Sequence, residues 1–278
     1  MKPTLFLPFI HSYGLMLAVG FYLGWWLAAR RAREQGEDPD DIGNIVLLAI
    51  VAGVGGSRLL YFWQYRKPGE PLWHIIKVWE GGLVFYGGLI GAAVAVGLYL
   101  HWRKANVWKL ADIIAPSAAI GQAFGRIGCF LNGCCFGGPC TRSFPLGVRF
   151  PGIFDAKGAA TGSAPYLDHL VEQHWILDTA RHSLAVHPTQ LYASLSLFTI
   201  AALVLVAEPW KKRHGELFGL VILLNALSRM GIELVRRDSE AVVLGLKGGQ
   251  LGALAVLAAG IVIFIWARRR GREAWAGG

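Results

Sequence analysis

Apolar runs of about 20 residues recur seven times along this chain and are separated by short polar segments. Each run is long enough to cross the hydrocarbon core of a bilayer as a helix. None of them alternates apolar and polar residues as the strands of a membrane barrel do. We therefore predict an all-α polytopic membrane protein with seven transmembrane helices, at residues 10–30, 43–64, 82–102, 107–127, 188–207, 215–235 and 249–267.

The composition agrees with a membrane protein. Of the 278 residues, 54% are hydrophobic and 16% are charged, whereas a soluble domain carries about a quarter charged residues. The net charge of +9 could indicate a nucleic-acid partner. The basic residues, however, stand in short clusters between apolar runs, which is typical of topogenic signals. We expect membrane lipids, and no nucleic acid, among the partners.

The distribution of basic residues predicts an orientation. The segments that follow spans one, three, five and seven hold 13 Lys and Arg in 46 residues, whereas the opposite side holds 11 in 99. By the positive-inside rule the N-terminus lies outside and the C-terminus lies in the cytoplasm. The first apolar run lacks a small-residue cleavage site, so we interpret it as a retained helix and not as a signal peptide.

One long segment, residues 131–187, separates spans four and five on the outer side. Leu146, Val148 and Phe150 alternate with polar or small residues, as in a strand. The segment is too short for an independent core. We expect it to form a small extracytoplasmic head inserted in a single membrane domain, residues 1–278. On the opposite side, Asp40 and Asp41 are expected to cap span two.

Two features suggest close packing or a binding site near the outer side. Arg58 lies at membrane depth in span two, where a charge is a functional candidate by default. Its side chain could instead snorkel to the headgroups. Glycine pairs at 81–82 and 87–88 flank the start of span three. They indicate either close helix packing or a backbone that approaches a ligand.

Spans four and six carry polar residues four positions apart, hence on one helix face. In the small-residue span four these are Gln122 and Arg126, and in span six they are Asn225, Arg229 and Glu233. Ionisable residues at this depth are unlikely to face lipid. Arg229 and Glu233 form either a structural ion pair or part of a polar substrate cavity.

His11 and Tyr13 stand at the outer boundary of span one, where anchoring in the outer leaflet explains them as well as a role in a site.

The chain holds four cysteines, all in the segment that follows Arg126. Their spacing, C-x4-C-C-x4-C, lacks the paired C-x2-C of structural zinc sites, and we predict no metal and no cofactor. One or two disulfides are favoured on the outer side, and free small hydrophobes or a catalytic thiol are the alternatives. The cysteines are Cys129, Cys134, Cys135 and Cys140.

Taken together, these segments resemble the prolipoprotein diacylglyceryl transferase family of the bacterial inner membrane. The matching motifs run through the whole chain in order. They are His11-Ser-Tyr-Gly-Leu15, Gly55-Gly-Ser-Arg58, Gly81-Gly-Leu-Val-Phe-Tyr-Gly-Gly-Leu-Ile-Gly91, Gly125-Arg-Ile-Gly-Cys-Phe-Leu-Asn-Gly133, Val148-Arg-Phe-Pro151, His187-Pro-Thr-Gln-Leu-Tyr192 and Arg229-Met-Gly-Ile-Glu233.

The resemblance implies transfer of the diacylglyceryl group of phosphatidylglycerol to the lipobox cysteine thiol of a prolipoprotein. The products would be a thioether and glycerol 1-phosphate. Because a phosphate leaves carbon, cations have to stabilise the leaving group. The resemblance implies catalytic roles for Arg126, Arg229, Glu233 and Tyr86. It implies substrate contacts for Arg126, Tyr13, His11, Arg58, Gly137, Asn132, Gln190 and Arg236.

Three positions depart from the family pattern. The usual signature has Asn where this chain has Cys129, Glu where it has Cys134, and His where it has Tyr86. A phenol with a pKa of about 10 is a poor general base. We therefore keep a non-catalytic phospholipid-binding homologue as the alternative function. A thiol-redox enzyme is a third hypothesis, against which the missing C-x2-C counts.

Overall fold

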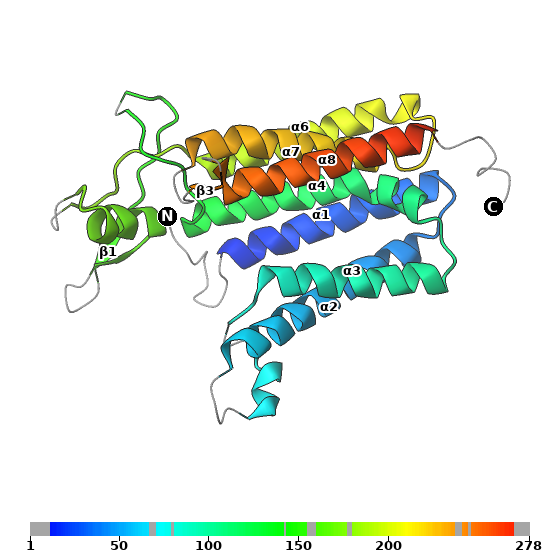
Figure 1. Cartoon of the computed structure of the whole chain (residues 1–278), viewed down its shortest axis with the longest axis horizontal. Coiled ribbons are helices and arrows are strands. Elements are labelled where there is room, and N and C mark those ends of the chain that lie inside the picture. Colours follow the sequence, from blue (N-terminus) through cyan, green and yellow to red (C-terminus); the bar gives the residue numbers. More distant parts are fainter. Residues whose placement is uncertain are drawn as a thin grey trace. The chain divides into compact units, whose positions relative to one another are not determined.

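The computed structural model describes residues 12–66, 71–78, 81–141, 143–154, 160–176, 180–236, 241–243 and 246–269, and its main elements are helices (Figure 1). His11, one of the expected site residues, lies outside the described residues. The long helices are α1 (Ser12–Glu34), α2 (Pro39–Tyr65), α3 (Phe85–Trp102), α4 (Val107–Asn132), α6 (Thr189–Ala207), α7 (Glu216–Val235) and α8 (Gly248–Arg269).

The remaining elements are short. Helical turns are η1 (Leu72–Ile76), α5 (Ala164–Leu167), η3 (Asp168–Glu172) and η4 (Glu208–Trp210). The strands form two antiparallel pairs: β1 (Gly152–Phe154) with β2 (Ala160–Gly162), and β3 (Ala241–Val243) with β4 (Leu246–Lys247).

Within the described parts of the chain, six helices are long and apolar enough to cross a membrane: α1, α2, α4, α7, α8, and α6 with the η4 turn that extends it. Residues Tyr86–Trp102 of α3 form a shorter apolar helix. The seven predicted spans thus correspond to these six helices and to α3. The chain is a multi-pass α-helical membrane protein.

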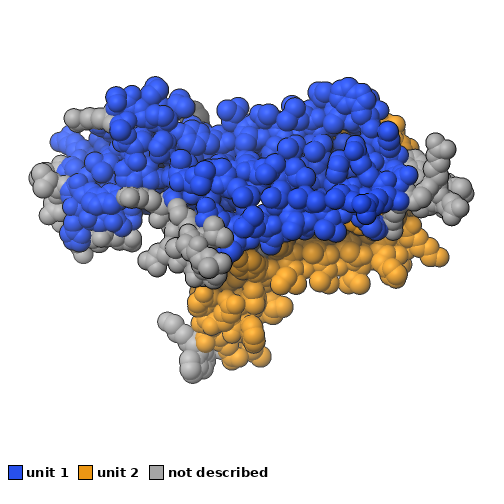
Figure 2. All heavy atoms as spheres, turned by 45° about the horizontal axis from the view of Figure 1, so that its top comes forward, with its two compact units in different colours: residues 1–24, 114–278 blue, residues 25–113 orange. Residues whose placement is uncertain are grey.

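The chain divides into two compact units, which Figure 2 colours separately. Unit 1 comprises residues 1–24 and 114–278, and unit 2 comprises residues 25–113. Helices α1 and α4 each contribute one end to unit 1 and the other end to unit 2. We describe the two units one after the other.

In unit 2, glycines bring α2 and α3 into backbone contact. A Cβ on Gly88 would lie 3.1 Å from the carbonyl oxygen of Gly53. A Cβ on Gly91 would lie 3.2 Å from the Cα of Gly56 and would also clash with the Ala52 carbonyl. Small residues at such positions let two helices approach closely. The glycine pair at 87–88 therefore serves helix packing, one of its two expected roles.

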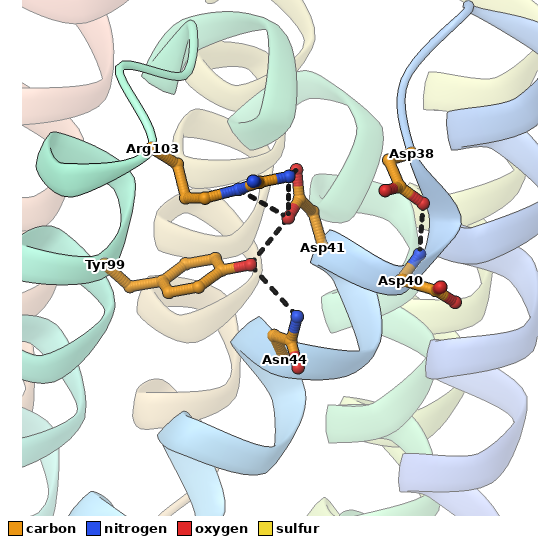
Figure 3. Close-up of polar contacts among 6 residues, drawn as sticks. All are labelled: Asp38, Asp40, Asp41, Asn44, Tyr99 and Arg103. Atoms are coloured by element: carbon orange, nitrogen blue, oxygen red, sulfur yellow. Dashed lines mark hydrogen bonds and ion pairs between the residues drawn. The ribbon is translucent and has the colours of Figure 1, made fainter.

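A polar cluster joins the N-terminal end of α2 to the C-terminal end of α3 (Figure 3). The Asp41 carboxylate accepts hydrogen bonds from the Tyr99 hydroxyl at 2.6 Å and from Nε of Arg103 at 3.0 Å. The N-cap of α2 is Asp38, whose side chain accepts from the backbone N–H of Asp40 at 2.9 Å. The expectation that Asp40 and Asp41 cap this helix was therefore wrong, because a residue before the helix is better placed to reach its free N–H groups.

A buried arginine compensates for the proline inside α4. Pro116 has no N–H, so the carbonyl of Asp112, four residues earlier, loses its helical partner. The guanidinium of Arg31 donates to this carbonyl at 2.9 Å and also to the carbonyl of Ile113. Arg31 is almost fully buried. Arg31 thus provides hydrogen bonds to the backbone of α4, although in the sequence it is part of a basic cluster.

In unit 1, the part of α4 from residue 114 onward runs beside α6, α7 and α8 (Figure 1). One apolar cluster joins α4, α6 and α7 through Ala115, Ile200, Val204, Leu217 and Val221. Helices α7 and α8 meet at a glycine, since a Cβ on Gly260 would lie 2.9 Å from the Leu223 nitrogen.

Helix α4 continues beyond its predicted end at residue 127 and stops at Asn132. The prediction was wrong because a helix tolerates an interior glycine such as Gly128 at a cost of only about 1 kcal/mol. Gly133, with a φ of 75°, ends the helix in the left-handed conformation that glycine adopts without strain. Arg126 therefore lies within α4, and the glycine-rich turn begins after it.

The described residues between 133 and 188 lie beyond the ends of the long unit 1 helices (Figure 1). Val148 pairs with Val186, and Pro151 with His182, as isolated bridges, while the regular strand β1 starts only at residue 152. The strand expected over 146–150 is therefore reduced to single bridges. Of its alternating residues, Phe150 is fully buried and Leu146 is exposed.

Replacing Gly91 by alanine should destabilise the α2–α3 pair by about 1–3 kcal/mol, because the new methyl group has to displace backbone atoms. The thermal unfolding midpoint in a fixed detergent measures this change. Gly97→Ala in the same helix is the matched control, since a Cβ there meets nothing within 4 Å. Equal midpoints for the two variants would contradict close packing at Gly91.

Candidate functional site

The candidate site lies where the glycine-rich loop 133–140 rests on the ends of α6 and α7. The Gly137 nitrogen donates to the carbonyl of His187 at 3.0 Å, and the Gly138 nitrogen donates to the carbonyl of Val235 at 2.8 Å. A Cβ on Gly137 would lie 2.8 Å from His187 and from Thr189. Gly137, expected as a substrate contact, is therefore required by the loop itself.

Side chains at the start of α6 fix the next part of the loop. Nε2 of Gln190 donates to the carbonyl of Cys134 at 2.6 Å, and the Thr189 hydroxyl donates to the carbonyl of Cys135 at 2.8 Å. Gln190 is 1% exposed. Among the described residues, its Oε1 has no hydrogen-bond partner. A buried acceptor of this kind is suited to a hydroxyl of a ligand.

The polar stripe of α7 forms an ion pair near the C-terminal end of the helix. Nη2 of Arg229 lies 3.1 Å from Oε2 of Glu233, whose side chain is 1% exposed, whereas that of Arg229 is 32% exposed. A Cβ on Gly249 would lie 2.5–2.7 Å from the Glu233 carboxylate group. Any larger residue at the start of α8 would therefore displace this carboxylate. The ion pair that the sequence suggested is present, and it leaves part of the Arg229 side chain exposed.

Helices α4 and α7 place two arginines at the same level of unit 1. Nδ2 of Asn225 donates to Oε1 of Gln122 at 3.2 Å. Both helices run toward the head, because α4 leads into it and α7 ends where Val235 binds the loop. Arg126 and Arg229 each follow their member of this hydrogen-bonded pair by one helical turn. The two arginines therefore lie at a similar level along α4 and α7, on the side of loop 133–140.

Arg126 is half-buried on α4. Within the described part of the chain, no carboxylate forms an ion pair with it. Tyr13 packs on the same helix, since a Cβ on Gly128 would lie 3.0 Å from its ring, and it interacts electrostatically with Arg126. Asn132, also expected in the site, is exposed at the end of α4. Arg236 is half-buried at the C-cap of α7.

Three of the four cysteines form a cluster beside Arg126. The sulfur atoms of Cys129, Cys134 and Cys135 all lie within 4.8 Å of one another. Hydrogen bonding with Cys129 and Cys134 lowers the pKa of the Cys135 thiol, and the guanidinium groups of Arg126 and Arg236 lower this pKa further.

Cys140 lies apart from this cluster. Its sulfur packs on Gly147, and burial raises the pKa of its thiol. All four cysteines are free thiols in the structure, so the expected disulfides are not formed in it.

Arg58 and Tyr86 belong to unit 2. Arg58 is 6% exposed, and its guanidinium donates to the carbonyl groups of His74 at 2.9 Å and of Gly81 at 2.5 Å. The alternative that Arg58 snorkels to the headgroups was therefore wrong. Arg58 lines an open cavity of about 480 Å³ together with Tyr61. Tyr86 is 69% exposed on α3. The substrate roles of Arg58 and Tyr86 remain predictions.

Sequence reasoning missed two residues of the site. Thr189 anchors the cysteine loop, and its place after a proline at a helix start was the available signal. Gly249 packs against Glu233, and its place at the start of span seven gave no sign of this contact. A contact between helix ends that lie 16 residues apart leaves no trace in local periodicity.

Comparison with known proteins gives a consistent result. Residues 4–266 match the family model described as prolipoprotein diacylglyceryl transferase. The chain is 32% identical to the phosphatidylglycerol–prolipoprotein diacylglyceryl transferase of Clostridium tetani, covering 95% of this chain and 97% of that protein. It is 32% identical to the Bacillus velezensis enzyme of the same name, covering 94% and 89%, and 31% identical to that of Erwinia tasmaniensis, covering 94% and 89%. The chain therefore belongs to the prolipoprotein diacylglyceryl transferase family.

Proposed function

We propose that this protein transfers the diacylglyceryl group of phosphatidylglycerol to the lipobox cysteine thiol of a prolipoprotein. The named substrates of its relatives support this activity. The structural observation that carries it is that Arg126 and Arg229 lie at a similar level along α4 and α7, with Arg229 paired to the buried Glu233. Such a pair suits an anionic headgroup that lies at the membrane surface.

The reaction requires the substrate sulfur to attack the glyceryl carbon that bears the phosphate oxygen. A carbon–sulfur bond forms, and the carbon–oxygen bond breaks. Its electron pair leaves with glycerol 1-phosphate, and the thiol proton passes to a base. Negative charge grows on the leaving phosphate, so fixed cations stabilise the transition state. Arg126 and Arg229 supply them, and Glu233 orients Arg229.

The other predicted residues take supporting roles in this proposal. The buried Oε1 of Gln190 accepts a hydrogen bond from a headgroup hydroxyl, and Tyr13 contacts the headgroup or the thiol. Tyr86 takes part in removal of the thiol proton. Substrate contacts are further proposed for His11, Arg58, Gly137, Asn132 and Arg236.

The placement in the membrane follows from the same proposal. The protein is a bacterial inner-membrane protein of seven spans, with the short helix α3 as the third. The charge asymmetry supports an outer N-terminus, a cytoplasmic C-terminus and an outer head at residues 131–187. Phosphatidylglycerol then reaches the arginines from the outer leaflet.

A second function is favoured by the departures from the family pattern at Tyr86, Cys129 and Cys134. A chain that kept the arginines and lost the proton acceptor would bind phosphatidylglycerol without turnover. The two functions differ in one measurable property, the formation of a thioether.

Arg126→Ala should lower thioether formation by about 10²-fold or more, because a cation that stabilises the leaving group is lost. Mass spectrometry of a lipobox peptide incubated with purified protein and phosphatidylglycerol measures the diacylglyceryl mass shift. Arg30→Ala, which removes an exposed arginine paired with Glu34, is the control. Full activity without Arg126 would remove this mechanism. A folded wild-type protein that binds phosphatidylglycerol without a mass shift would establish the second function.

Gly249→Ala should lower the transfer rate, because the new methyl group displaces the Glu233 carboxylate that orients Arg229. The same peptide assay measures the rate. A matched control in the same helix is Gly252→Ala, since a Cβ there meets nothing within 4 Å. If both variants keep the wild-type rate, Glu233 does not position Arg229 for catalysis.

Tyr86→Phe should lower the rate about 10²-fold or more if the hydroxyl takes the thiol proton. Tyr86→His, which restores the usual family residue, should retain activity and shift its optimum to lower pH, because imidazole titrates near 6.5. An unchanged rate in Tyr86→Phe would exclude the phenol from proton transfer and would leave the roles of the arginines intact.

A further inference from the structure

The three-thiol cluster has the dimensions of a metal site. Three sulfurs that surround one ion in a trigonal plane at about 2.3 Å lie about 4.0 Å from one another. The sulfurs of Cys129, Cys134 and Cys135 lie within 4.8 Å of one another before any ion is present. Shifts of a fraction of an ångström, which cysteine rotamers can provide, would therefore bring all three onto one ion.

The backbone holds the three thiols in place. Gly133 and Cys135 both adopt positive φ angles, 75° and 58°, so the chain turns sharply on each side of Cys134. The Cys134 nitrogen donates to the Cys129 carbonyl at 3.1 Å, closing this turn. A left-handed conformation is uncommon for a residue with a side chain. At Cys135 it brings the third sulfur toward the other two.

The hydrogen bonds from α6 make this loop rigid. Gln190 and Thr189 bind the carbonyl groups of Cys134 and Cys135, and Gln190 is almost fully buried. The thiols are half-buried, so an ion can reach them while much of their solvation is already lost. A site that is organised before binding loses less entropy when the ion arrives.

The number and type of ligands point to one kind of ion. Among the described His, Cys, Asp and Glu residues, this group contains three members, all thiols. Zinc in structural sites is almost always four-coordinate. Thiolates select soft ions, among them Cu(I). Three thiolates and one Cu(I) carry a net charge of −2, and the guanidinium groups of Arg126 and Arg236, which interact with Cys135, balance it.

We propose that Cys129, Cys134 and Cys135 form a trigonal thiolate site that binds one Cu(I) ion. Binding forms three copper–sulfur bonds and releases the thiol protons to solvent. No electron is transferred in this step. The site adjoins Arg126 and is separate from the proposed chemistry of the transferase, because it uses sulfur atoms that the mechanism leaves unassigned.

Anaerobic titration of the purified full chain with Cu(I), against a coloured Cu(I) chelator, tests the proposal. We expect one ion per chain to be withdrawn from the chelator. Cys129→Ser and Cys135→Ser should each weaken binding by about tenfold or more, since loss of even outer-shell groups costs that much. Cys140→Ser is the matched control and should bind as the wild type does. Its thiol lies outside the group.

Alkylation of the wild-type protein gives a second measurement that needs no variant. Cu(I) should protect Cys129, Cys134 and Cys135 from iodoacetamide and leave the reactivity of Cys140 unchanged, as mapped by mass spectrometry. A wild-type chain that withdraws no copper overturns the proposal, as does Cys140→Ser weakening binding as much as Cys129→Ser. Tighter competition by Zn²⁺ than by Cu(I) overturns the choice of ion. None of these readouts depends on transferase activity.

Discussion

A carboxylate buried among apolar helices has to be paired with a cation, and this requirement organises the C-terminal end of α7 in unit 1. Glu233 is 1% exposed, and removing the partner of such a group typically costs about 3–5 kcal/mol. The carboxylate therefore fixes Arg229 one turn earlier on α7. A side chain at position 249 would displace this carboxylate, so the ion pair favours glycine at the beginning of α8. One electrostatic interaction thus links the conformation of Arg229 to the contact between α7 and α8.

The arginines of the long helices have different uses that the sequence could not separate. Arg31 and Arg58 direct their guanidinium groups at backbone carbonyls within unit 2, where one compensates for Pro116 and the other binds the carbonyls of His74 and Gly81. In unit 1, Arg229 pairs with the buried carboxylate of Glu233. A charged side chain within a membrane helix is expected to have a structural or a chemical role. The acceptors around its charged group show which of the two roles it has.

Much of the fold followed from the sequence because hydrophobic length and helix periodicity are local properties. The starts of α4, α6 and α7 lie within one residue of their predicted positions. The end of α4 was misplaced by five residues, because the helix continues through Gly128, which lies in contact with Tyr13. The cap of α2 was assigned to Asp40 and Asp41, and Asp41 instead binds Tyr99 and Arg103 from the end of α3. Local pattern cannot foresee such a partner.

The residue types of the candidate site were predictable from the sequence, whereas the contacts that position these residues were not. Polar residues at i and i+4 placed Arg126 and Arg229 on definite faces, and the hydrogen bond between Gln122 and Asn225 brings those faces together. The loop between them is shaped by contacts from His187, Thr189 and Val235, all distant in sequence.

The same geometry explains how this chain can hold cysteines where its family usually has Asn and Glu. The loop is fixed by backbone carbonyls, to which Gln190 and Thr189 donate. The side chains at 129 and 134 contact each other and Cys135, since the three sulfur atoms lie within 4.8 Å of one another. Cysteine at these two positions therefore changes the chemistry beside Arg126, while the loop keeps its backbone hydrogen bonds to α6.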